Sequence, residues 1–345
     1  MKINNKIKIL LCGQFFEHSL ENSYLRAFKS LGCQVKKFEL FNHSFINNFF
    51  EKDKLNKYFS SLNFRKFLAL NYNKQLIRSF EQINMDVCFF FDLTYIFPET
   101  IHFLKKKNIK TICFLPDNPL KGYSNHRPEI INSIKELDIF LCWGTKIIKQ
   151  LKKSGQKNII FHTYAWDSIR NKKFKIKKNY NDDITFIGNW DHHREKIINN
   201  LINNFPIKIW GEKDWFNKSN SLKIRNSYTG KSAYNQKFSH ICFNSFLNIN
   251  ILRKQSLEGG GLNMRSFEIL GEGGFLLQDY GPDPIRIFKN FSKYILFKSS
   301  DDMIKKILFM RQNKNFIKKI KPELSNLVKK NHTYIKRSKK IIDII

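Results

Sequence analysis

The sequence lacks several features that would place a protein in a compartment at once. No apolar run approaches the ~20 residues that a membrane-spanning helix needs, and residues 1–12 alternate lysine with isoleucine instead of forming a signal-peptide core. The six cysteines are scattered without a C-x-x-C pair, which argues against a zinc site and for small buried thiols in a reducing compartment. These absences favour a cytoplasmic location, with peripheral attachment to the inner face of a membrane as a further option.

Several catalytic motifs are also missing. No G-x-G-x-x-G follows the first predicted strand, which argues against a dinucleotide dehydrogenase, and no G-x-S-x-G elbow is present. Thr229-Gly230-Lys231-Ser232 imitates the end of a phosphate-binding P-loop, but the position of its first glycine is Arg225. No Asp-x-Asp pair offers close carboxylates to a divalent ion, so we expect neither a metal nor a bound cofactor. The adjacent His192 and His193 point in different directions and are interpreted as surface residues.

Acidic residues are scarce, because 61 lysines and arginines face 29 aspartates and glutamates, for a formal charge of +32. Such an excess fits an anionic partner such as nucleic acid or an anionic membrane surface. It also fits a bias of composition, since lysine, asparagine, isoleucine and phenylalanine are abundant together. Lysine outnumbers arginine, which planar phosphate and base recognition favours, so no specific nucleic acid is expected as a partner.

Short apolar runs recur between segments that can be helical, over a length that suits two domains. Near-continuous apolar strands of this kind indicate parallel sheets covered on both faces, and two sets of them indicate two doubly wound α/β domains. The polar, basic stretch within residues 164–183 predicts the linker between them. The predicted strands are 7–12, 34–38, 87–91, 111–115, 139–142, 159–162, 184–187, 207–210, 241–244, 275–278 and 294–297.

Three further segments carry readable signals. Residues 48–83 are basic and aromatic, and they predict either a helical insertion that covers the first sheet or an amphipathic surface facing a membrane. Ser299 to Asp302 form a capping signal before a helix, and residues 333–345 predict a closing helix with its isoleucines on one side.

Residues 259–280 are the most informative stretch. A glycine run is expected to open a short helix that carries Arg265 and Glu268, and a glycine pair then leads into an apolar strand. A helix start holds phosphate well, glycines allow a close approach of the backbone, and the i, i+3 spacing places the arginine and the glutamate on one face. One can meet a phosphate and the other the hydroxyls of a ribose, so the stretch predicts a sugar-nucleotide site. The residues expected to pack beneath are Met264, Phe267 and Leu270.

These residues resemble a known family. Leu-Asn-Met-Arg-Ser-Phe-Glu-Ile at 262–269, followed by Gly-Gly-Phe-Leu-Leu at 273–277, is similar to the spore-maturation CgeB-like glycosyltransferases, relatives of the group 1 (family 4) enzymes. The resemblance is strong from residue 184 onward and loose before residue 110. The other matching segments are 185–189 with Arg194, 209–211, 239–244, 332–334 with Arg337, 114–119 and 164–167.

The resemblance implies a GT-B architecture of two Rossmann-like domains with an interdomain cleft. It implies an acceptor-side domain at 1–168, a nucleotide-sugar-binding domain at 169–330, and a C-terminal helix at 331–345 that packs back on the first. Glu268 matches the acidic position for ribose hydroxyls, and Arg265 would meet the diphosphate. Gly188, Asn189 and Arg194 would lie against the phosphates or sugar, although Arg194 can also be an exposed residue at a helix start. The remaining positions carried over for the donor are Gly211, Asn244, Gly261, Leu262, Asn263 and Met264.

One position departs from the family. The broader group has a second glutamate eight residues before Glu268, often assigned to the donor sugar, and this chain has Gly260 there. Glu258 is offset by two positions, so the identity of the donor sugar stays open. On the acceptor side, Gly13-Gln14 is a candidate cleft loop, and His18 and Asp117 are the polar candidates for catalysis at carboxyl ends of strands.

The resemblance therefore implies a metal-independent glycosyltransferase that moves a sugar from a nucleoside diphosphate to a glycan, lipid or protein acceptor. Cell-surface polysaccharide or glycoconjugate synthesis is the expected setting, and retention of configuration follows from the wider group. The composition leaves two alternatives: a non-enzymatic basic protein that binds nucleic acid or an anionic membrane surface, and a degenerate transferase that binds sugars without turnover.

Overall fold

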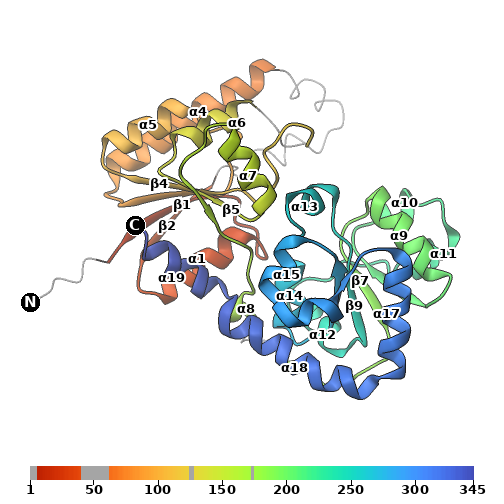
Figure 1. Ribbon diagram of the computed structural model, residues 1–345. Coiled ribbons are helices and arrows are strands. Elements are labelled where there is room, and N and C mark those ends of the chain that lie inside the picture. Colours follow the sequence, from red (N-terminus) through yellow and green to blue (C-terminus); the bar gives the residue numbers. More distant parts are fainter. Residues whose placement is uncertain (1–5, 40–61, 124–127, 172–174) are drawn as a thin grey trace, which may run out of the picture. The chain divides into compact units, whose positions relative to one another are not determined.

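The computed structural model describes residues 6–39, 62–123, 128–171 and 175–345 of the chain. The chain forms two compact units, each with its own parallel sheet (Figure 1). Unit 1 comprises Met1–Trp143, Ile147–His162 and Ser338–Ile345, and unit 2 comprises Gly144–Lys146 and Thr163–Arg337. The domain boundaries expected at 168 and 330 stay predictions.

Unit 1 is built on a six-stranded sheet in the order β2-β1-β3-β4-β5-β6, with every neighbouring pair parallel. Strands β3 and β5 are buried along their whole length, as expected for a parallel sheet with helices on both faces. Helix α1 covers one face, and α4 and α5 cover the other (Figure 1). The strands are β1 (Lys8–Gly13), β2 (Gln34–Glu39), β3 (Val87–Phe90), β4 (Lys110–Phe114), β5 (Ile139–Cys142) and β6 (Ile159–Phe161). The helices from the N-terminus to β6 are α1 (Leu20–Ser30), α4 (Leu62–Gln82), α5 (Pro98–Lys106), α6 (Pro128–Glu136) and α7 (Thr145–Lys153).

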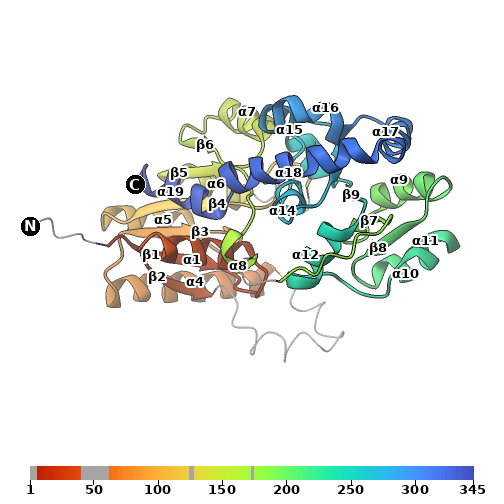
Figure 2. The same cartoon turned by 90° about the horizontal axis from the view of Figure 1, so that it is seen from below.

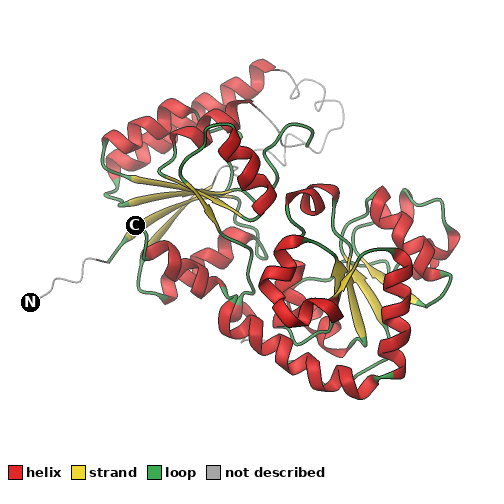
Figure 3. Cartoon of the chain, in the orientation of Figure 1, coloured by secondary structure: helices red, strands yellow, loops and turns green. Residues whose placement is uncertain are grey.

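Unit 2 is built on a five-stranded parallel sheet in the order β11-β10-β9-β7-β8. Helices α12 and α14 lie on one face and α9 and α17 on the other, and α10 and α11 lie beside β8 (Figures 2 and 3). The strands are β7 (Ile184–Ile187), β8 (Ile207–Trp210), β9 (Leu247–Asn250), β10 (Leu276–Asp279) and β11 (Leu296–Phe297). The helices are α8 (Ser168–Asn171), α9 (His192–Ile202), α10 (Asp214–Asn217), α11 (Leu222–Ser227), α12 (Asn235–Asn244), α13 (Lys254–Gly259), α14 (Arg265–Gly271), α15 (Pro282–Phe288), η1 (Lys289–Phe291), α16 (Ser292–Ile295), α17 (Ser300–Gln312), α18 (Lys314–Asn331) and α19 (Tyr334–Ile342), which continues into unit 1.

The prediction of two doubly wound α/β units is confirmed. Strands β5, β7 and β8 have the predicted bounds, and β1, β2, β3, β4, β6 and β10 differ by one residue at either end. The capping signal is also confirmed, because the Ser299 side chain accepts a hydrogen bond from Asp302 N at the start of α17. Five of the six cysteines are buried, and Cys33 is half-buried. Residues 48–61 of the predicted insertion at 48–83 lie outside the described part of the chain. The remaining part forms the helix α4.

The strand predicted at 241–244 is wrong. These residues form the last turn of α12, and the strand is β9, which begins at Leu247. Phe238 and Cys242 are buried on one face of the helix at i, i+4 spacing, so the apolar run is the buried stripe of a helix rather than a strand. The predicted strand at 294–297 is also shortened, because its first half belongs to α16.

Candidate functional site

The carboxyl ends of β7 and β9 define the crevice of unit 2 where the strand order reverses, the usual ligand position in an open parallel sheet. Arg194, near the start of α9, joins the loops that follow these two strands. Its Nε donates to the Ile251 carbonyl at 2.9 Å, and an Nη donates to the Asn189 carbonyl at 3.0 Å. Arg194 is only 8% exposed, so the reading of it as an exposed residue at a helix start is wrong. Burial, with Arg253 nearby, lowers its pKa to about 10.

The glycines after β7 and β8 bring two loops together. The Gly188 carbonyl accepts from the Trp215 indole at 2.7 Å, and Gly188 N donates to the Trp210 carbonyl at 2.9 Å. A Cβ at Gly211 would overlap that same Gly188 carbonyl, so the close approach requires glycine at position 211. The loop of Gly188 and Asn189 is therefore held by Arg194 on one side and by Trp215 and Gly211 on the other.

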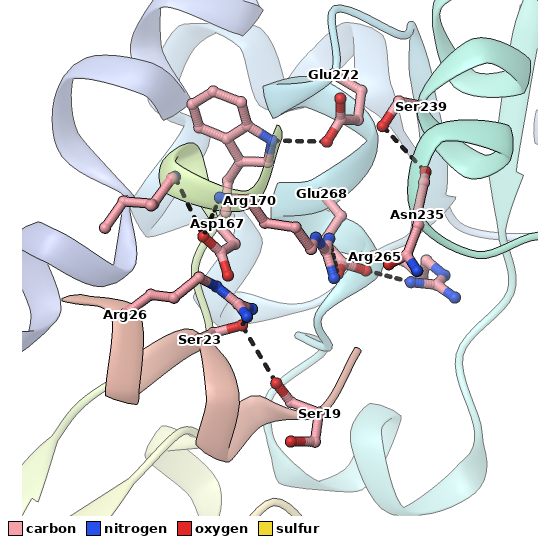
Figure 4. Close-up of polar contacts among 12 residues, drawn as sticks. Ser19, Ser23, Arg26, Asp167, Arg170, Asn235, Ser239, Arg265, Glu268 and Glu272 are labelled. Atoms are coloured by element: carbon pink, nitrogen blue, oxygen red, sulfur yellow. Dashed lines mark hydrogen bonds and ion pairs between the residues drawn. The ribbon is translucent and has the colours of Figure 1, made fainter. Parts of the chain in front are cut away.

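Helix α14 carries a buried carboxylate held by two arginines (Figure 4). Glu268 is 5% exposed and forms an ion pair with Arg265, three residues earlier on the same face, as the spacing predicted. Its other oxygen lies 3.6 Å from an Nη of Arg170, which comes from α8. The Arg265 guanidinium also stacks on the Phe238 ring, 4.4 Å from the ring centroid. The charge of Glu268 is thus compensated from two sides.

A second buried carboxylate follows one turn later on α14. Glu272 is 5% exposed and accepts a hydrogen bond from the Trp166 indole at 2.8 Å. Burial raises the pKa of Glu272, and hydrogen bonds from Trp166 and Ser239 oppose that rise. The indole lies so close to Gly271 that a Cβ there would overlap it. Two buried glutamates thus lie four residues apart, Glu268 on α14 and Glu272 at its C-terminal cap, each with its own partner.

An amide network supports the start of α14. Asn250, the last residue of β9, exchanges two hydrogen bonds with Asn263 at 2.9 and 3.1 Å and donates to Gln278 at 3.2 Å. Asn263 Oδ1 also accepts from Ser266 N at 3.1 Å, which satisfies one of the free N–H groups of the helix start. Asn263 therefore positions the helix. Leu262 is fully buried, whereas Met264 is half-buried.

The glycine run closes α13 rather than opening α14. Gly260 and Gly261 adopt φ values of +144° and +93°, which side chains disfavour. A Cβ at Gly260 would overlap the Asp283 carboxylate, whose residue is 1% exposed. A glutamate at position 260 would have room only if Asp283 moved. Of the residues expected to pack beneath α14, Phe267 and Leu270 are fully buried.

Asp279 ends β10 close to Arg194. Its Oδ2 accepts from Leu252 N at 2.6 Å, and burial raises its pKa to about 7. The hydrogen bond and the charge of Arg194 lower the pKa, so desolvation is the dominant effect. This carboxylate therefore titrates near neutral pH.

Asn244 does not join these residues. It ends α12, before β9 begins, and so lies at the amino end of the sheet. Its side chain accepts from Asn179 N at 2.7 Å and donates to the Lys177 and His240 carbonyls at 3.0 Å. The expectation of Asn244 as a donor contact followed from the mistaken strand, and its observed bonds anchor the segment before β7.

Unit 1 has its own hollow at the carboxyl ends of β1, β3 and β4. It has a volume of about 270 Å³ and brings together Gln14, Glu21, Asp92 and Asp117. Burial raises the pKa of Glu21, and the charge of Asp92 raises it further. His18 is exposed and does not line this hollow. Across the described parts of the chain, no group of three or more His, Cys, Asp or Glu side chains is placed to hold a metal ion.

Sequence reasoning missed four residues of the unit 2 site: Arg170, Asn250, Glu272 and Asp279. Glu272 had a usable signal, since it follows Glu268 at i, i+4 on a helix already identified. The other three come from separate elements, and only the fold brings them to α14 or Arg194.

Comparison with known proteins bears on this site directly. Residues 193–343, which include α14 and Arg194, match the family model for glycosyl transferase-like proteins. This segment is thus similar to glycosyl transferase-like domains. Comparison with curated proteins finds no match.

Solved structures with the GT-B fold are similar to this chain over nearly its whole length. Sucrose-phosphate synthase from Thermosynechococcus elongatus has a TM-score of 0.67 at 8% identity, with 98% of each chain covered. The UDP-forming trehalose-phosphate synthase from Burkholderia xenovorans has a TM-score of 0.64 at 10% identity, also with 98% of each covered. The UDP-GlcNAc 2-epimerase from Neisseria meningitidis, bound to UDP-GlcNAc, has a TM-score of 0.54 at 11% identity, covering 98% of this chain and 99% of that one. Within the described residues, no helix is long and apolar enough to cross a bilayer.

Proposed function

We propose that the protein is a CgeB-like glycosyltransferase that takes a sugar from a nucleoside diphosphate donor. The observation that carries the proposal is the Arg265–Glu268 pair on α14, buried beside a positive-φ glycine run inside the glycosyl transferase-like domain. The epimerase structure similar in fold was solved with UDP-GlcNAc, which supports a nucleoside diphosphate sugar as the ligand class.

The donor-side roles follow from the chemistry of the pair. A carboxylate accepts two hydrogen bonds at once, so Glu268 suits the vicinal hydroxyls of a ribose. Arg265 suits the diphosphate, whose negative charge grows as the glycosidic bond breaks. In the absence of a donor the two residues neutralise each other, and Arg170 keeps Glu268 paired when Arg265 turns to phosphate. The loop of Gly188 and Asn189, fixed by Arg194, is proposed to lie against the same phosphates.

No metal is assigned to this reaction, since guanidinium groups can take the role of a divalent ion at the leaving diphosphate. On the acceptor side we keep Asp117 and His18 as the catalytic candidates and the hollow around Gln14 and Asp117 as the acceptor site. A glycan, lipid or protein hydroxyl is the proposed acceptor, in synthesis of cell-surface polysaccharide or glycoconjugate. Retention of configuration and a cytoplasmic location, with peripheral membrane attachment as an option, complete the proposal.

A thermal-shift series against UDP, GDP, CDP and ADP tests the donor site. One nucleotide should stabilise the protein by about 3 kcal/mol at about 100 times its Kd. Glu268→Gln and Arg265→Met should each abolish the shift. The matched control is the exposed Lys254–Glu258 pair on α13, at 3.9 Å and i, i+4 spacing, where Glu258→Gln should change nothing.

Two results would count against the proposal. One is a nucleotide shift that persists in both Glu268→Gln and Arg265→Met. The other is the absence of any shift with nucleotides or their sugars, together with salt-sensitive binding to polyanions, which would favour a basic binding protein instead.

A further inference from the structure

A hollow in unit 2 lies at the amino ends of the strands, at the opposite end of the sheet from Arg194. It lies between α18, the residues just before β7 and the turn between α12 and β9, and has a volume of about 710 Å³. Small-molecule pockets typically measure about 300–1,000 Å³. We call this hollow the amino-end pocket. None of the residues assigned to the donor pair lines it.

One wall of the amino-end pocket is aromatic. The Tyr180 ring stacks on Phe243 with centroids 5.3 Å apart, and Tyr180 is nevertheless 62% exposed. Phe246 and Ile317 extend this apolar wall. An exposed aromatic face over a hollow of this size offers a partner to an apolar or aromatic ligand body.

The other wall of the amino-end pocket is positively charged, because α18 contributes lysines to it. Four lysines are among the residues that line the amino-end pocket, and the one acidic residue among its described lining is Asp182, which pairs with Lys314 at 2.8 Å. The resulting positive excess favours an anionic ligand. The four lysines are Lys314, Lys318, Lys321 and Lys329.

Lys321 lies where the aromatic wall meets the charged one. Its Nζ donates to the Phe243 carbonyl at 2.7 Å and lies 5.4 Å from the ring centroids of both Tyr180 and Phe243. Burial lowers the pKa of this ammonium to about 8. An anion beside Lys321 would favour its charged form and would use the two N–H groups that the carbonyl leaves over.

A buried hydroxyl in the amino-end pocket lacks a partner. Ser325 is 4% exposed, and its Oγ makes no hydrogen bond to any described residue. Pro322, one turn earlier on α18, has no N–H to offer the Lys318 carbonyl. Since buried polar groups are normally satisfied, the hydroxyl is available to hydrogen-bond a ligand that reaches it.

We propose that the amino-end pocket binds a small amphipathic anion, with an apolar or aromatic body against Tyr180 and Phe243 and a carboxylate or phosphate on Lys321 and Ser325. The ligand needs both parts, because the aromatic wall would contact an apolar body and the lysine-rich wall would contact an anionic group. The site is independent of the proposed sugar transfer.

Fluorescence of 8-anilinonaphthalene-1-sulfonate, an aromatic anion, provides the test. The probe should bind saturably, and decanoate and decyl phosphate should displace it. Lys321→Met should weaken binding at least about tenfold, the range for a lost charge-assisted hydrogen bond. Lys319→Met is the matched control, because Lys319 is exposed on the same helix and does not line the pocket. Asn326→Trp, at an exposed lining position, should block the probe without changing the core.

Several results would overturn the proposal. Equal displacement by neutral decanol would exclude the anionic requirement, and equal displacement by inorganic phosphate would exclude the apolar body. Wild-type binding in Asn326→Trp would place the probe elsewhere, and this variant decides the question even if Lys321→Met folds poorly. Nucleotide shifts in both variants should match the wild type, which separates this site from the donor site.

Discussion

Glu268 and Arg265 form an ion pair on one face of α14, and Arg170 approaches the same carboxylate from α8 at 3.6 Å. The arrangement holds a nearly buried negative charge ready for hydroxyl groups while it keeps that charge compensated. The stability of unit 2 and the proposed binding of a donor therefore depend on the same three side chains.

Removal of the Glu268 carboxylate should destabilise the fold. Glu268→Ala leaves two arginines without their shared partner, and breaking a buried pair costs about 3–5 kcal/mol. Urea unfolding of wild type and variant measures the change in the free energy of unfolding. Glu258→Ala, at a half-exposed side chain, should cost less than about 1 kcal/mol. Equal costs for the two variants would contradict the role given to burial.

The Trp166–Glu272 hydrogen bond should be worth about 1–3 kcal/mol. Trp166→Phe keeps a ring against Gly271 but leaves the buried Glu272 carboxylate short of a donor. A double-mutant cycle with Glu272→Met, which removes the acceptor, followed by chemical denaturation, isolates the pair. A coupling energy near zero would show that Trp166 acts through packing alone.

Gly260→Ala should destabilise the protein more than Gly230→Ala. Both positions have positive φ, at +144° and +73°, but only at 260 would the added Cβ meet another residue, Asp283. We expect about 1–2 kcal/mol at Gly230 from backbone strain and a larger loss at Gly260, measured by urea unfolding. Similar losses at both positions would mean that Asp283 moves aside.

The stability of unit 2 should fall as the pH rises from about 4 to 7. Burial raises the pKa of Asp279 from 3.8 to about 7, so in this window the folded state binds more protons than the unfolded one. Asp279→Asn keeps the acceptor for Leu252 N and should flatten the pH dependence, by about 2–4 kcal/mol between the two ends. Melting temperatures across this range provide the measurement. Asp182→Asn, at a side chain 77% exposed, should leave the pH profile unchanged, and a wild-type profile in Asp279→Asn would refute the assignment.

Apolar runs were sufficient to predict most of the sheet in each unit, because strands buried on both faces have few polar residues. The run at 241–244 failed for the same reason, since three consecutive apolar residues fit a strand and the buried stripe of a helix equally well. Its consequence was the mistaken placement of Asn244 in the donor site.

The Arg265–Glu268 pair was predictable because both residues lie on one turn of a helix. Arg170 is almost a hundred positions away in the sequence, and its approach to Glu268 depends on how α8 packs in unit 2. Helical spacing cannot encode such a contact. Gly260 was visible in the sequence as a departure from the family that the chain resembles, but its close approach to the Asp283 carboxylate required the fold.

Unit 1 is discontinuous in the sequence, since Ser338–Ile345 cluster with residues that end at His162. During synthesis the ribosome must therefore add all of the segment Thr163–Arg337 before the last piece of unit 1 exists. The main segment of unit 2, Thr163–Arg337, is continuous, so its synthesis is not interrupted by a segment of unit 1. Unit 1 therefore cannot reach its complete native structure before the segment of unit 2 has been synthesised.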